Sequence, residues 1–135
     1  MTIPAEALAW LEEKCSSERW ATVTSERSAR QDWVRHLGGR VMRAGLAGTI
    51  RPADSFHLDV AGSGVPTAFV AAAKDAALTV LVSQGLQPIL RVELSLFDFD
   101  CHEEQTSRVV VYKAAYELVS RLVGVGPDSE PNIEW

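Results

Sequence analysis

Hydrophobic and polar positions alternate in two segments of the chain, residues 55–61 and 89–99. In the first segment Phe56, Leu58 and Val60 take every second position, and leucines and a valine do the same in the second. Successive side chains of a strand point to opposite faces, so this pattern is typical of strands with one face in the core and one in water. We therefore predict strands over 55–61 and 89–99. A shorter alternation over 19–24 fits either a third strand or a link between helices.

Apolar residues recur at helical spacing in other segments. Residues 66–84 are apolar almost all round, which predicts a mostly buried helix that ends at Gly85. In 4–17 and 107–123 the apolar residues form a single stripe, which predicts two amphipathic helices.

Residues 25–46 also fit a helix. Trp33, Val34, Leu37 and Val41 form an apolar stripe at 100° per residue, with arginines over the remaining surface. A Gly38–Gly39 pair inside this segment costs a helix about 1 kcal/mol per glycine relative to alanine. The pair therefore marks a break in the helix or a close approach of another backbone.

These elements predict an α+β fold in two layers, formed by residues 1–135 as one domain. A chain of 135 residues, 47% hydrophobic and 23% charged, is long enough to bury a core without disulfides or metals. We expect a small mixed or antiparallel sheet packed by helices. If strands 55–61 and 89–99 are neighbours, the helix between them makes them parallel and the sheet mixed.

Composition limits the cellular compartments and the classes of binding partner that we expect for this chain. The two cysteines, Cys15 and Cys101, lack a CxxC spacing, which predicts reduced thiols in a reducing compartment. The N-terminal stretch carries acids where a signal peptide needs basic residues, and no long uncharged apolar segment occurs, so we predict a cytoplasmic protein without a membrane span. A net charge of −5 disfavours nucleic-acid binding.

The segment Gly62-Ser63-Gly64 lies between a predicted strand and a predicted helix, where a glycine turn can bind phosphate. The third glycine of a dinucleotide fingerprint is absent, and the alternating strands differ from the continuous apolar runs of a parallel sheet. We interpret the glycines as a structural turn and predict no cofactor. The chain also lacks a GxxxxGK[ST] loop, a GxSxG elbow and an HExxH pair, and we predict no metal site.

Polar residues on the predicted strands offer one candidate for chemistry. Alternation places His57 with Asp59 on one polar face and Arg91 with Glu93 on another. If the strands are neighbours, a His–Asp pair lies beside an arginine, which suits acid/base catalysis on an anionic substrate. Cross-strand charge pairing on an open sheet face explains the same residues without any catalysis.

Charge is unevenly distributed along the chain. Residues 26–51 hold six arginines against two acids, a local charge of +4, which leaves −9 for the rest. We expect a basic helix over 27–43 and an acidic loop over 98–104 to be binding surfaces, although the arginines also suit pairing with the protein's own acids. The candidate binding residues are Arg35, Arg40, Arg43, Arg91, Asp98, Asp100, Glu103 and Glu104.

These observations support two functional hypotheses. The first is a non-catalytic protein–protein interaction module, such as a small bacterial-type immunity (toxin-neutralising) protein or a regulatory adaptor, because separated basic and acidic patches favour electrostatic recognition. The alternative is a protein, or a small enzyme, that binds a small molecule or anion on the polar sheet face around His57, Asp59 and Arg91. A homodimer that uses the exposed sheet face near Phe97 is compatible with both.

Overall fold

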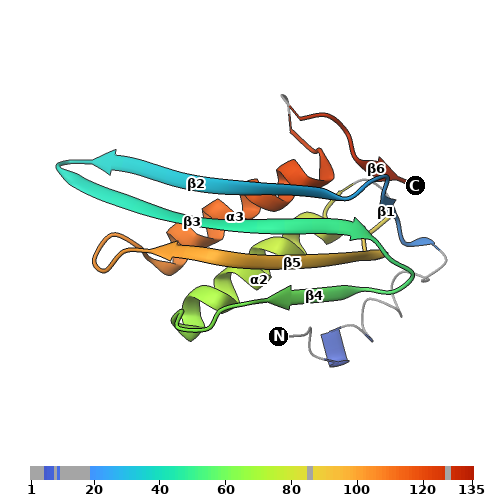
Figure 1. Ribbon diagram of the computed structural model, residues 1–135, viewed down its shortest axis with the longest axis horizontal. Helices are drawn as coiled ribbons and strands as arrows, with labels where there is room; N and C mark the ends of the chain where they lie inside the picture. Colours follow the sequence, from blue (N-terminus) through green and yellow to red (C-terminus); the bar gives the residue numbers. More distant parts are fainter. Residues whose placement is uncertain (1–4, 8, 10–18, 85–86, 127–128) are drawn as a thin grey trace.

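The chain folds into two layers, a four-stranded sheet and a pair of helices that both pack on one of its faces (Figure 1). This computed structural model describes residues 5–7, 9, 19–84, 87–126 and 129–135. The sheet has the strand order β2-β3-β5-β4, and the helices are α2 and α3. The predicted two-layer α+β class is thus confirmed. The helix predicted over 4–17 lies mostly outside the described residues.

The segment 25–46 forms two strands, so the helix predicted there is wrong. Strands β2 (Arg27–Leu37) and β3 (Arg40–Pro52) pair antiparallel in continuous register from Arg27–Ile50 to Leu37–Arg40. Gly38 and Gly39 both have positive φ, 54° and 83°, as the type I′ turn of a tight hairpin requires. The glycine pair that disfavours a helix is therefore the turn of this hairpin.

Strands β4 and β5 confirm both alternating segments. Strand β4 (His57–Val60) pairs parallel with β5 (Val92–Cys101), which in turn pairs antiparallel with β3, so the sheet is mixed. Helix α2 (Thr67–Val82) makes the crossover between the parallel strands, and α3 (Arg108–Val123) follows β5. Both helices occupy the segments predicted for them.

The core lies between the helices and one face of the sheet. Inward-facing aliphatic side chains of β3, β4 and β5 are almost completely buried against the apolar stripes of α2 and α3. The opposite face, called the outer face below, carries the polar half of each alternating strand. The largest fully buried side chains of the four-stranded sheet are Leu46, Ile50, Val92, Leu94 and Leu96.

The structure explains why positions 62 and 64 of the Gly62-Ser63-Gly64 segment are glycine. A Cβ at Gly62 would collide with the Val70 methyl Cγ2, because α2 packs closely on this turn. Gly64 has a φ of +79°, and the Val65 N–H bonds the Gly62 carbonyl at 3.0 Å. The segment forms the tight turn that leads into α2, as the sequence interpretation expects.

The polar tail docks through a buried asparagine. Two short strands, β1 (Thr22–Val23) and β6 (Ile133–Glu134), pair antiparallel beside the end of α3. Between α3 and β6, the fully buried Asn132 accepts hydrogen bonds from the hydroxyls of Thr24 and Ser25 and donates to the carbonyls of Ser25 and Leu122. This network attaches the C-terminal segment to the start of the sheet. Of the segment 19–24, only residues 22 and 23 are a strand.

Candidate functional site

Strand pairing places the predicted acid/base residues on the outer face. His57 lies opposite Glu93 and Asp59 opposite Ser95 in the β4–β5 pair. The Arg51 guanidinium of β3 binds Glu93 through two hydrogen bonds of 2.7 and 3.1 Å. This hydrogen-bonded arginine lowers the pKa of the Glu93 carboxyl, and the carboxylate raises the pKa of Arg51. Glu93 is therefore held as an ion-pair partner of Arg51, as expected of a cross-strand charge pair.

The remaining predicted groups on this face lie outside both hollows that are described below. The His57 ring nitrogen Nε2 lies 3.0 Å from the Ser55 hydroxyl, and both residues are exposed. Arg91 precedes β5, where its amide donates to the Ala21 carbonyl and its carbonyl accepts from the amide of Ala53. Neither of the hollows described below includes His57, Asp59 or Arg91.

The predicted basic and acidic surfaces meet each other at one end of the sheet. His102, in the turn after β5, lies 3.1 Å from an Asp100 oxygen and also contacts the guanidinium of Arg43. The backbone of Arg43 bonds the same turn through Gln105 and Thr106. Asp100 of the acidic loop and Arg43 of the predicted basic segment therefore contact the same imidazole ring. Glu103 and Glu104 remain exposed in the turn.

A small hollow of about 270 Å³ on the outer face also has paired charges. Arg30 and Asp32 of β2 form a salt bridge of 3.4 Å over Gly45, and the Arg30 guanidinium donates to the Asp98 carbonyl at 3.0 Å. A Cβ at Gly45 would collide with an Asp32 oxygen, so the glycine makes room for this pair. Opposite charges in contact leave this hollow poorly suited to an ion of either sign.

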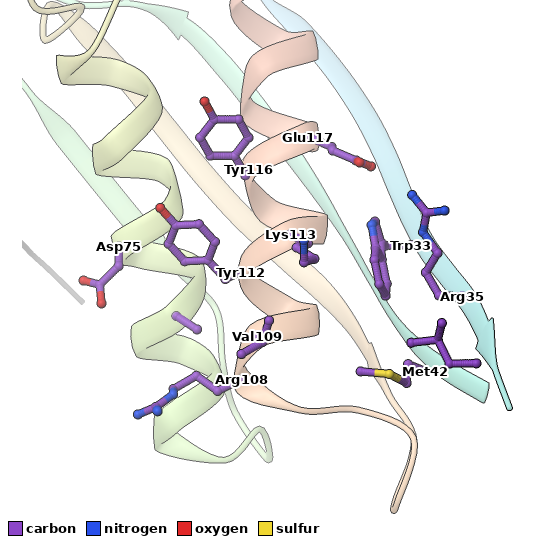
Figure 2. A pocket seen from close by; sticks show the side chains of 12 residues that line it. Trp33, Arg35, Met42, Asp75, Arg108, Val109, Tyr112, Lys113, Tyr116 and Glu117 are labelled. Atoms are coloured by element: carbon purple, nitrogen blue, oxygen red, sulfur yellow. The ribbon is translucent and has the colours of Figure 1, made fainter. Parts of the chain in front are cut away.

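A larger open groove, of about 1000 Å³, lies on the helical side, between the far half of the hairpin and α3 (Figure 2). The first half of β2 is tied to α3, because Gln31 donates to Glu117 and accepts from Arg121. The tip of the hairpin extends past the helices (Figure 1), and inward side chains of its far half line the groove. The apolar and aromatic lining residues are Trp33, Leu37, Met42, Ala72, Val109, Tyr112 and Tyr116.

Large apolar side chains in this groove are exposed. Leu37 and Val109 keep 59% and 57% of their surface accessible, and Tyr116 keeps 38%. Trp33 lies between two cations, with Arg35 at 5.6 Å and Lys113 at 5.8 Å from its ring centroid (Figure 2). Charged rim residues of both signs surround the apolar floor: Arg35, Arg108, Lys113, Asp75 and Glu117.

Sequence reasoning missed most of this groove. It placed Arg35 on a binding surface, but it assigned Trp33 to the core side of a helix that does not exist. Val109, Tyr112 and Tyr116 recur at helical spacing outside the buried stripe of α3, and that second stripe is the signal that was available. Arg40 begins β3 at the exposed tip of the hairpin, next to the groove but outside its lining.

Cys101, at the end of β5, is a free thiol. Partial burial raises its pKa, and the neighbouring Asp100 carboxylate adds to the effect, so the thiol is protonated at neutral pH. Cys15 lies outside the described residues. Within the part of the chain that the structure describes, no three His, Cys, Asp or Glu side chains form a group suited to a metal ion.

Fold and site together define a small two-layer α+β domain with an apolar groove beneath a projecting hairpin. No protein-family model and no curated protein matches the sequence. A crystal structure of a protein from Thermus thermophilus is similar, with a TM-score of 0.60, 16% sequence identity and 72% of this chain covered. The chain spans only 15% of that neighbour's length, so the similarity shows the fold alone. Among the described residues, no helix is both long and apolar enough to cross a membrane.

Proposed function

We propose that this chain is a non-catalytic protein-interaction module that binds an apolar segment of another protein in the groove between the β2–β3 hairpin and α3. The observation that carries this proposal is the gathering of exposed Leu37, Val109 and Tyr116 around one concave surface. Exposed apolar side chains that cluster on a soluble domain mark interaction sites more often than scattered ones do.

The types of residue in the groove support this proposal. Tryptophan, tyrosine, methionine and arginine are enriched in the buried centres of protein interfaces, and the groove contains all four. Trp33 and Tyr112 are only half-buried, so a partner would bury further aromatic surface. Aromatic anchors of this kind carry most of the binding energy at many interfaces.

The charges around the groove favour a partner segment that carries acids. Arg35, Arg108 and Lys113 outnumber Asp75 and Glu117 on the rim. Arg40 adds a further exposed cation at the hairpin tip. Such complementarity speeds association and selects partners more than it adds affinity. An immunity-type or adaptor protein acts through occupancy of this kind and needs no catalytic group.

Capture of partners from the native source tests the proposal. The tagged chain is used as bait and the bound proteins are identified by mass spectrometry, in parallel with Val109→Asp and Val82→Asp baits. Both valines are exposed on helices, but only Val109 lines the groove. We expect one or more proteins to bind the wild type and the Val82→Asp bait, and to be reduced at least about tenfold on Val109→Asp, because a buried carboxylate at an interface costs well over about 1.4 kcal/mol.

Two results would contradict the proposed site. In one, the captured proteins bind all three baits equally. In the other, they are lost when Asp98, Asp100, Glu103 and Glu104 are reversed in charge but retained on Val109→Asp, which would place the interface on the acidic loop.

A further inference from the structure

Strand β2 is an unusually long edge strand, and no other strand of the described residues pairs with its outer edge. It has eleven residues, contains no proline or glycine, and pairs with β3 without a bulge. Proteins usually protect an edge strand by short length, proline, a bulge, charged side chains or a covering element, and of these devices the far half of β2 has only the charges of Asp32 and Arg35. The other edge, β4, has only four residues. The far half of β2 therefore has the properties of a strand that pairs with another strand.

One hydrogen bond shows which residues of β2 direct their backbone N–H and C=O groups away from β3. The Arg30 carbonyl accepts from the Arg121 guanidinium at 3.0 Å, so Arg30 points its backbone groups away from β3. In an antiparallel pair this direction alternates along the strand, so Asp32, Val34 and His36 also point outward. Towards the start of β2 the side chain of Arg121 already covers the edge, whereas the tip of the hairpin extends beyond the helices (Figure 1).

We propose that two copies of this chain pair antiparallel through β2, about a two-fold axis at Val34. In this register Asp32 lies opposite the partner subunit's His36, and the two Val34 side chains lie opposite each other. On the helical face, Trp33 lies opposite the partner subunit's Arg35. Each of these pairs is complementary, because a carboxylate meets an imidazole and an aromatic ring meets a guanidinium.

Registers with the axis at residues 31–33 or at Arg35 are less favourable. An axis at Asp32 would oppose two carboxylates, and an axis at Arg35 would oppose two guanidinium groups, which repel across a strand pair. With an axis at Gln31 or Trp33, the outward backbone groups of Arg30 would have to bond the partner strand, but the Arg30 carbonyl already accepts from Arg121. An axis at Val34 opposes no like charges and leaves that bond intact, and the Asp32 carbonyl that it uses has only a long bond of 3.5 Å from the exposed Gln31 amide to replace.

Pairing about this axis would join two four-stranded sheets into one of eight strands. Residues that share a face remain on one face across an antiparallel pair, so both α3 helices would lie on the same side. The two grooves would then adjoin at the seam. Val34 itself lies on the outer face, so self-pairing can be tested without altering a residue that lines the groove. Pairing of two copies of this chain also does not depend on the other protein that we propose for the groove.

Sedimentation of the full chain tests the proposal first. We expect a mass about twice that of the 14.7 kDa chain. Val34→Pro removes an N–H that β3 does not use, and proline is tolerated at the free edge of a strand, so this variant should be a folded monomer by circular dichroism.

Cysteine crosslinking then tests the register, in a chain with Cys15 and Cys101 replaced by serine. In the proposed register the two copies of Val34→Cys have Cα atoms about 5.5 Å apart, within the range of a disulfide. Ser28→Cys is the matched control, on the same edge and face, but its two copies would lie about 40 Å apart at about 3.3 Å per residue. We expect mild oxidation to crosslink Val34→Cys and to leave Ser28→Cys monomeric.

A wild-type chain that sediments as a monomer at every concentration would overturn the proposal. A dimer that survives in folded Val34→Pro, or in which Ser28→Cys crosslinks as well as Val34→Cys, would also overturn it, because the copies would then meet elsewhere. If Val34→Pro fails to fold, the two cysteine variants alone decide between these outcomes.

Discussion

At the scale of single residues, Asn132 has the largest structural role among the polar side chains that the structure describes. Its carboxamide oxygen accepts from Thr24, from the Ser25 hydroxyl and from the Ser25 amide, at 2.7 to 3.1 Å. Its backbone N–H bonds the Val123 carbonyl, and its carbonyl accepts from the Thr24 amide. One buried residue therefore joins the tail, the end of α3 and the start of the sheet.

Replacement of Asn132 by alanine should destabilise the fold strongly. The substitution leaves the buried Leu122 carbonyl without its donor and removes the bonds to Thr24 and Ser25, and we expect a loss of about 2 kcal/mol in the free energy of unfolding. Urea denaturation measures the loss, with Glu134→Ala, at an exposed position of the same tail, as the control. An Asn132→Ala chain as stable as Glu134→Ala would show that the tail does not dock through this residue.

Glu93 should make stability depend on pH. Its pKa is lowered in the folded chain by the hydrogen-bonded Arg51, so the ion pair stabilises the fold above the usual glutamate pKa of about 4.3 and is lost as pH falls through the folded value. We expect Glu93→Gln to be less stable than wild type at neutral pH, with the difference closing in acid. Glu103→Gln controls for the loss of one negative charge. A difference that persists unchanged in acid would contradict the ion pair.

The sequence predicted the positions of some single residues in the fold but not the roles of others. The alternation that placed His57, Asp59 and Glu93 on polar faces was correct, because each lies on a strand with one buried side. Nothing in the sequence indicated the role of Asn132, since its partners Thr24 and Ser25 lie more than 100 positions away. Contacts this distant depend on the completed fold and leave no local pattern.

At the scale of elements, the β2–β3 hairpin is the main departure from the sequence prediction. Trp33, Val34 and Leu37 fit a helical stripe, but the end of the hairpin extends past the helices, so no buried face imposes strict alternation there. In β3 the small residues Ala44, Gly45, Ala47 and Gly48, which flank Leu46, weaken the contrast between the two faces. The helices and strands that pack against the core were predicted correctly, because burial makes their periodicity clear.

A Gly38→Ala substitution distinguishes the hairpin from a helix, because it changes the free energy of unfolding in opposite directions in the two structures. Gly38 has a φ of +54° and open space around its α-carbon, so alanine there should cost about 1–2 kcal/mol through backbone strain alone. Asparagine, which suits this position of a type I′ turn, should cost less. Chemical denaturation of the two variants measures both values. A helix would give the opposite sign, since Gly→Ala within a helix stabilises by about 1 kcal/mol.

At the scale of the whole molecule, the fold separates two kinds of surface. On the outer face, arginines meet the protein's own carboxylates, as in the pairs Arg51–Glu93 and Arg30–Asp32. The uneven charge along the sequence is therefore partly neutralised within the fold. Beneath the hairpin, apolar and aromatic side chains remain exposed, and no description of charge along the sequence could locate them.

The groove is the central feature of this account, and hydrogen exchange on the complex with a captured partner tests it most directly. Amide exchange of the chain is compared with and without that partner. We predict slower exchange in the far half of the β2–β3 hairpin and in the first turns of α3, around Val109 and Tyr112, with β4 unchanged. Protection confined to β4 and loop 98–104, with the hairpin and α3 exchanging as before, would contradict the proposed site.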